Sequence, residues 1–305
     1  MFSAPHFHND EAARRLLEEI RWPEGRSCPH CGTFDRSYAT KRTQKCGATV
    51  YRCGEPECRK DFSVTTKSVM ESSHIPLHKW RQGFFLMASS KKGVSAHQLH
   101  RMLGITYKAA WFMAHRIREA MRADGTFGPL GGEGMTVEAT KRLGKTTKRG
   151  KRGHGGQRPI IALVERGGSV RTFYAAVADK ATVTKIVAEN VARESYLYTD
   201  ESRLYGDADQ LFADHSTVKH SAGEYVRYEG DRTIHTNTVE NVFSVFKRGM
   251  RGVYQHCDEK HLNRYLAEFD FRYNHRSALG VEDEARTHAA IKGAPGKRLT
   301  YHLPD

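Results

Sequence analysis

The sequence has no run of about 18 apolar residues, the length that a membrane-spanning helix needs. Neither end carries an amphipathic basic helix of the kind that lies on a membrane surface. The N-terminal segment also lacks the charged and apolar regions of an export signal. These absences argue against a membrane partner and predict a soluble protein of the cytoplasm.

Acidic residues are too few to balance the basic ones. The 305 residues include 35 Asp and Glu against 49 Lys and Arg, which gives a formal net charge of +14 and an isoelectric point near 9.5. Such an excess of positive charge favours a polyanionic partner, and nucleic acid is the leading candidate. Hydrophobic residues make up 38% of the chain, so we expect one sizeable domain with smaller modules.

Cysteine is scarce except in one short segment, where five of the six cysteines lie between Cys28 and Cys58. In a chain without an export signal, such a cluster favours metal binding over disulfide bonds. Cys28 and Cys31 form one pair and Cys53 and Cys58 another, which predicts a tetrahedral zinc site that replaces a hydrophobic core. Cys46 either substitutes for one of these ligands or remains a free thiol.

Residues 8–22 and 74–121 carry apolar side chains at helical spacing. Within the longer stretch, Ser95 is a candidate N-cap, and Gly104 lies where a helix-turn-helix motif needs its turn. The second helix of such a motif reads the major groove of DNA. A three-helix bundle without DNA contact is the alternative. The basic residues that this helix would offer to DNA are Lys108, His115, Arg116 and Arg118.

Glycine is frequent at residues 124–134, which predicts a linker, and a short strand is expected at 135–139. Residues 141–158 then contain eight Lys or Arg and no acid. This composition is typical of a flexible basic loop that becomes ordered on phosphate. The DNA-binding candidates in the loop are Lys148, Arg149, Lys151 and Arg152.

The chain from 159 to 273 alternates between strand and helix patterns. A hairpin at 159–177 is followed by a helix, a strand ending in acid, a short helix at 211–214, a strand at 217–220 and two longer helices. The order β-β-β-α-β-α-β-α predicts an α/β domain with a mixed sheet. The predicted organisation is a zinc ribbon with its leading helix at 1–70, a helix-turn-helix module at 71–123, a linker at 124–134, the α/β domain at 135–280 and a tail at 281–305.

Three carboxylates stand at the ends of elements in the α/β domain, namely those of Glu138, Asp200 and Glu240. Acids at neighbouring strand ends converge at one edge of a sheet and repel one another unless a cation lies among them. The predicted ion is Mg²⁺ or Mn²⁺, which supports phosphoryl transfer. Lys247 lies two turns after Glu240 on the same helix edge and suits a phosphate. The simpler alternative is that Glu240 and Lys247 are solvated charges on an amphipathic helix.

Several motifs together resemble a known family, the DDE transposases of bacterial insertion sequences, in the branch that has an N-terminal zinc ribbon and is related to the eukaryotic Merlin elements. The motifs are Cys-Pro-His-Cys-Gly at 28–32, Cys-Arg-Lys-Asp-Phe-Ser-Val at 58–64, Ile-Ala-Leu-Val-Glu-Arg-Gly-Gly at 161–168, Tyr-Thr-Asp-Glu at 198–201, Glu-Tyr-Val at 224–226, His-Thr-Asn-Thr-Val-Glu at 235–240, Lys-His-Leu-Asn-Arg-Tyr at 260–265 and Phe-Arg-Tyr-Asn at 271–274.

The resemblance implies an RNase H-like catalytic core. It makes Asp200 and Glu240 the second and third metal ligands and Asn237 a close neighbour of the site. It also implies that the partners are terminal inverted repeats and target DNA in the bacterial nucleoid, and that the protein acts as a dimer or larger assembly.

The first strand departs from the family pattern. Relatives have Val-Asp-Glu-Thr-Tyr, whereas this chain has Val-Glu-Ala-Thr-Lys at 137–141. Either Glu138 replaces the first catalytic Asp, or about two residues including that Asp are missing and Glu138 is the surface acid that precedes it. The leading hypothesis is a DNA transposase. The alternatives are a transposase-derived DNA-binding protein without catalysis and, more distantly, a zinc-ribbon transcription factor.

Overall fold

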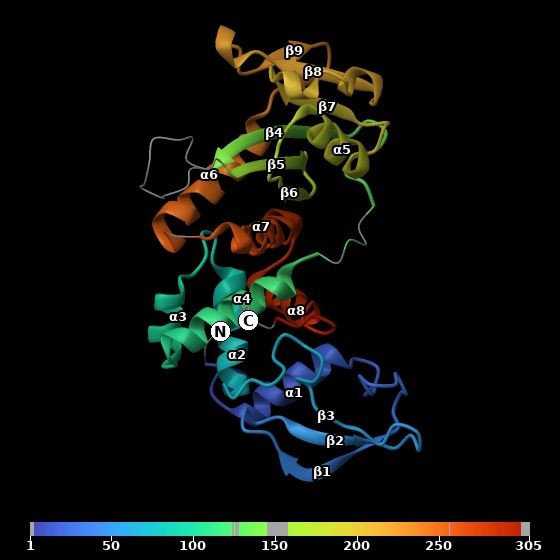
Figure 1. Cartoon of the computed structure of the whole chain (residues 1–305), viewed down its shortest axis with the longest axis vertical. Coiled ribbons are helices and arrows are strands. Elements are labelled where there is room, and N and C mark those ends of the chain that lie inside the picture. Colours follow the sequence, from blue (N-terminus) through green and yellow to red (C-terminus); the bar gives the residue numbers. More distant parts are fainter. Residues whose placement is uncertain (1–2, 124, 126–127, 145–157, 256, 300–305) are drawn as a thin grey trace. The chain divides into compact units, whose positions relative to one another are not determined.

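The computed structural model describes residues 3–123, 125, 128–144, 158–255 and 257–299. The chain forms two compact units, one comprising Met1–Arg122 with His275–Asp305 and the other Ala123–Asn274 (Figure 1). The expected zinc ribbon, helical module and C-terminal tail therefore share one unit. Within the described residues, no helix is both long and apolar enough to cross a membrane.

The first unit begins with a helix and a small sheet. Helix α1, Asp10–Arg21, starts where the Asn9 side chain accepts a hydrogen bond from the Ala12 N–H. Three antiparallel strands follow in the order β1-β2-β3. Their bounds are Ser37–Thr43, Thr49–Cys53 and Asp61–Phe62. The helix expected at 8–22 is confirmed.

Four helices complete the first unit. They are α2 at Leu77–Ser89, α3 at Ala96–Leu103, α4 at Tyr107–Met121 and α8 at Asp283–Lys292. Ser95 caps α3, and Gly104 adopts the left-handed conformation (φ 57°) that a residue without a Cβ tolerates best, so the two helices and the turn between them are confirmed. The expected tail instead contains α8, which packs against α2, where the buried Arg81 pairs with Glu284.

The second unit is built on a mixed sheet of five strands in the order β6-β5-β4-β7-β8 (Figure 1). Strand β5 runs antiparallel to both of its neighbours, β4 and β6, whereas β7 and β8 run parallel to β4. The strand bounds are Thr136–Gly144, Arg158–Glu165, Val170–Tyr174, Tyr196–Asp200 and Asp214–Val218. The predicted mixed α/β domain is confirmed.

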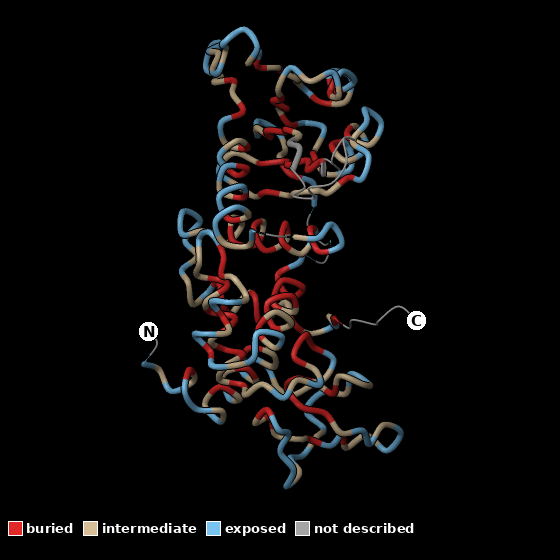
Figure 2. The backbone as a smooth tube through the Cα atoms, turned by 60° about the vertical axis from the view of Figure 1, so that its left-hand side comes forward, coloured by how far each residue is buried: buried red, intermediate tan, exposed pale blue. Residues whose placement is uncertain are grey.

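Alternate residues of each strand point to opposite faces of the sheet. Val137 and Ala139 of β4 pack with helix α5, Lys180–Asn190, on one face. The other face is covered by α6, Asn237–Gly249, and α7, Glu259–Asn274. Figure 2 colours the buried residues of the chain red. The even-numbered residues of β4, among them Glu138 and Thr140, therefore point to the side of α6.

The structure differs from the sequence prediction in four further places. Strand β4 continues into the segment expected to be a basic loop. Leu130, expected in the linker, is buried in the core of the second unit and bridges to Val191. The expected helix at 211–214 is a single 3-10 turn at Ala208–Gln210, so β8 begins earlier than predicted. A small hairpin of β9, Arg227–Glu229, and β10, Arg232–Ile234, was not predicted because its strands are only three residues long.

Further single turns of 3-10 helix lie at Pro5–Phe7, Arg203–Tyr205, His220–Ala222 and Ser277–Leu279, and a π-helical turn at Met250–Tyr254 follows α6.

Candidate active site and zinc centre

The cysteine pairs of the first unit meet in one cluster. The sulfur atoms of Cys28, Cys31, Cys53 and Cys58 all lie within 4.8 Å of one another. A four-thiolate set is the donor set of structural zinc, so the predicted cluster is confirmed.

Cys46 does not belong to this cluster. Its sulfur is buried and lies 3.6 Å from Oε1 of Gln44. Burial raises the pKa of this thiol, which keeps it protonated. Of the two interpretations offered by the sequence, the structure supports the free thiol.

Glu138 lies fully buried on β4, and its carboxylate is surrounded by donors. One oxygen accepts hydrogen bonds from the Thr238 hydroxyl (2.8 Å) and from Nε of Arg166 (2.7 Å). The other accepts from the Val239 N–H (2.9 Å), and Nδ1 of His235 lies 3.1 Å from the first. Glu138 is therefore not a surface acid, and its oxygens are already engaged within the protein.

These contacts make Glu138 the cap of helix α6. The first N–H groups of a helix lack intrahelical partners and carry partial positive charge, so a carboxylate at this end is stabilising. Thr236 occupies the N-cap position of α6, but its own side chain makes no capping hydrogen bond. The cap comes instead from a strand about 100 residues earlier in the chain, as the Val239 bond shows.

Arg166 ties the approach to α6 to the sheet. Besides Glu138, its guanidinium donates to the carbonyl oxygens of Thr233 (2.7 Å) and His235 (2.9 Å). Burial, and then the charge of Arg166, lower the pKa of His235 and so favour its neutral form. Glu138 and Arg166 together hold the start of α6, and with it Glu240, at a fixed place on the sheet.

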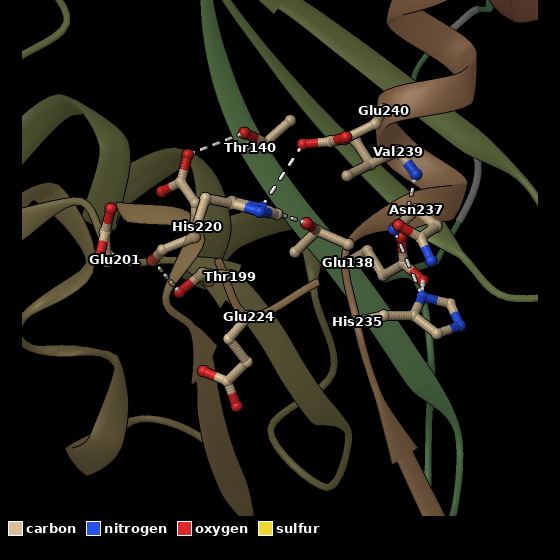
Figure 3. Close-up of polar contacts among 12 residues, drawn as sticks. Glu138, Thr140, Thr199, Glu201, His220, Glu224, His235, Asn237, Val239 and Glu240 are labelled. Carbon is tan, nitrogen blue, oxygen red and sulfur yellow. Dashed lines mark hydrogen bonds and ion pairs between the residues drawn. The ribbon is translucent and has the colours of Figure 1, made fainter. Parts of the chain in front are cut away.

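A second polar group lies beside this cap (Figure 3). The Thr140 hydroxyl donates to Oδ2 of Asp200 at 3.1 Å, at the end of β7. Nε2 of His220 lies 3.5 Å from Oε1 of Glu240 and 3.2 Å from the Thr236 hydroxyl. His220 was not singled out from the sequence, because a lone histidine after a strand carries no signal until α6 is placed next to it.

Only part of this group suits a divalent cation. Asp200 and Glu240 supply carboxylate oxygens, the donors that Mg²⁺ and Mn²⁺ prefer. Among the described residues, however, the four cysteines are the only set of three or more His, Cys, Asp or Glu whose ligand atoms converge within 4.8 Å. The three carboxylates that were expected to meet do not form such a set, because the oxygens of Glu138 cap α6.

The remaining candidates are placed as follows. Lys108 is exposed at the start of α4, whereas Arg118 is 2% exposed and His115 is fully buried, so neither of these two is open to a phosphate. Arg116 is half-buried and donates to the Glu71 carbonyl at 3.0 Å. Lys247 and Asn237 are exposed on α6. The loop candidates Lys148, Arg149, Lys151 and Arg152 lie outside the described residues.

Comparisons with known proteins decide the family. Residues 118–274, which include both polar groups of the second unit, match the ISXO2-like transposase domain. The chain belongs to this transposase family. Residues 8–61, which include the four clustered cysteines, match a transposase zinc-ribbon domain, as the cysteine spacing predicted.

A relative of this chain comes from an archaeon. The uncharacterized protein in transposable element ISH50 of Halobacterium salinarum is 27% identical over 285 residues, which are 87% of this chain and 91% of that protein. The chain is therefore similar to a transposable-element protein along almost its whole length.

Proposed function

We propose that this protein binds the ends of its insertion element and cuts and joins DNA by two-metal phosphoryl transfer. The observation that carries the proposal is the placement of Asp200 and Glu240. Asp200 ends a parallel strand and accepts a hydrogen bond from Thr140. Glu240 lies in the first turn of α6, next to His220. Carboxylates at such a strand end suit the catalytic site of an α/β sheet, and the mixed sheet is that of the proposed RNase H-like core.

Each residue has a stated task in this proposal. Asp200 and Glu240 would hold Mg²⁺ or Mn²⁺, which supplies activation of a water or DNA 3′-hydroxyl and stabilises the leaving oxygen. Lys247, exposed two turns beyond Glu240, faces the DNA backbone. Asn237 stands at the start of the same helix and orients the bound strand. Arg166 and Glu138 hold these side chains in position by fixing the start of α6.

DNA recognition falls to the first unit in this proposal. Its zinc ribbon and the pair α3 and α4 would bind the terminal inverted repeats, and the excess of positive charge would hold both the repeats and the target DNA. Two or more copies would act together on the paired ends. The proposed setting is the nucleoid of a bacterium, with the element in the branch related to the Merlin elements.

Strand transfer on DNA that carries the element's ends, with Mn²⁺ or Mg²⁺, tests the proposal. The parent protein is expected to give products. Asp200→Ala removes a cation ligand and is expected to reduce them on the order of 10²-fold or more, since a misplacement of the reacting atoms by about 1 Å already has an effect of this size. Glu201→Gln is the matched control, since this neighbouring acid instead accepts hydrogen bonds from Ser221. Equal activity of the parent and Asp200→Ala would refute the assigned site.

The engagement of Glu138 favours a second candidate, a transposase-derived protein that still binds DNA but no longer cuts it. A site without the first acid would lack one of its cation ligands. In that case the parent gives no products on any DNA with either ion, while Thr140→Asp restores them. Intact terminal repeats around the gene favour a recently mobile element instead.

Lys108 provides a test of DNA binding alone. Lys108→Ala is expected to weaken binding to all DNA sequences alike and to reduce the slope of log affinity against log salt by about 1, because one phosphate contact releases about one counterion. Fluorescence anisotropy across a range of salt concentrations measures this slope. Lys185→Ala, an exposed lysine on α5, is the control. An unchanged slope in Lys108→Ala would remove α4 from the DNA interface.

A further inference from the structure

The residue of β4 that borders the carboxylate of Asp200 is Thr140. The parallel register of β4 and β7 pairs Ala139 with Thr199, so the next residues along the two strands are Thr140 and Asp200. Thr140 is 2% exposed and donates its hydroxyl proton to Oδ2 of Asp200 at 3.1 Å. Glu138 lies one pleat away, toward the start of α6.

We propose that Thr140, and not Glu138, is the residue of β4 whose side chain contacts the divalent cation. The site of this chain is then a two-carboxylate site of Asp200 and Glu240, with a neutral hydroxyl where a third carboxylate would complete it. This inference rests on the proposed function. In this inference, Glu138 positions α6. The cation site has one negative charge fewer because Thr140 is neutral.

The spacing of the oxygens is compatible with this placement. Neighbouring ligands in an octahedron of about 2.1 Å radius lie about 3 Å apart. The Thr140 and Asp200 oxygens have this separation, at 3.1 Å. A hydroxyl is an acceptable oxygen ligand, but it brings no charge. Since the number of charged ligands tunes the affinity of such sites over orders of magnitude, this chain is expected to bind the ion weakly.

The engagement of Glu138 excludes it from the same role. Its oxygens accept bonds from the Arg166 guanidinium, the Thr238 hydroxyl and the Val239 N–H. Turning this carboxylate toward Asp200 would leave the start of α6 uncapped and the Arg166 guanidinium without its acidic partner, both of which are costly in a buried place.

A carboxylate at position 140 is expected to change how the melting temperature of the protein depends on Mn²⁺. Without an ion, Thr140→Asp places a second negative charge about 3 Å from Asp200, and this repulsion lowers the melting temperature. With Mn²⁺ bound, the two carboxylates become ligands and the melting temperature rises again. The variant is therefore expected to be less stable than the parent without Mn²⁺ and to show a larger Mn²⁺-dependent rise in melting temperature.

The experiment titrates Mn²⁺ into the full-length, zinc-loaded protein and follows the EPR signal of free Mn²⁺. Thr140→Asp is expected to bind at least about tenfold more tightly than the parent, and Thr140→Val, which removes the hydroxyl, more weakly. Two controls match the first variant. Thr140→Asn has the same shape without the charge, and Thr136→Asp places the same charge on the same face of β4, about 13 Å away. Neither control is expected to gain affinity.

The proposal is overturned if Thr140→Asp binds Mn²⁺ no more tightly than Thr140→Asn, or if Thr140→Val binds it as the parent does. Should Thr140→Asp be unfolded without metal, refolding on addition of Mn²⁺ supports the proposal and failure to refold contradicts it. Strand transfer is a separate readout. A parent that transfers strands while Thr140→Asp gains no affinity refutes this inference alone, and tight binding without any strand transfer refutes the proposed function alone.

Discussion

Replacing Glu138 by Ala is expected to lower the free energy of unfolding of the second unit by about 3–5 kcal/mol, because removal of one partner from a buried ion pair leaves the other uncompensated. Glu138 is fully buried and Arg166 mostly so, with 24% of its side chain exposed. The same change leaves the Val239 N–H without its acceptor. Urea unfolding, followed by a probe in the second unit, measures the shift in midpoint.

Two further variants separate these effects. Glu138→Gln keeps hydrogen-bonding atoms but removes the charge. Its free energy of unfolding should therefore lie between that of the parent and that of Glu138→Ala. Glu189→Ala removes an exposed acid that lies 3.9 Å from Lys185 on α5, and such surface pairs contribute about 0–1 kcal/mol. If Glu138→Ala costs no more than Glu189→Ala, the capping role is wrong.

The example of Glu138 shows where sequence reasoning fails. An acidic residue at an even-numbered position of β4 could be a metal ligand, a surface acid or a buried helix cap. The choice depends on which partners arrive from elsewhere, here Arg166 from the turn after β5 and Val239 from α6. Neither partner is near Glu138 in the chain, so no local pattern distinguishes the three roles. The same holds for His220, whose neighbour Glu240 comes from α6.

Features set by local spacing were predictable. The alternation in β5 distributes Ile161 and Leu163 to one face and Ile160 and Ala162 to the other, which is the period of a strand buried on both sides. The turn at Gly104 follows from its freedom to adopt positive φ. In α4, by contrast, spacing placed Lys108 and Arg118 on one helix but could not tell the exposed residue from the buried one.

Removal of zinc is expected to unfold the small sheet of the first unit. The strands β1, β2 and β3 comprise only seven, five and two residues, and their apolar cluster is small, with Tyr51 and Phe62 as its buried aromatic residues. In such modules the free energy of metal binding, about 10–16 kcal/mol in zinc-finger peptides, serves as folding free energy. A strong chelator or Cys28→Ser should therefore abolish the near-ultraviolet circular dichroism and hydrogen-exchange protection of this region.

Two controls make the zinc result specific. Cys46→Ser and Cys257→Ser change thiols outside the cluster, so both variants should retain the same zinc content as the parent by metal analysis. The amide protons of β4 and β5 should keep their protection in Cys28→Ser, because the second unit has its own core. A purified parent without zinc would contradict the assignment of the cluster, as would Cys28→Ser and Cys53→Ser variants with unchanged protection of β2. Loss of protection in both units at once would show that the second unit does not fold independently of the ribbon.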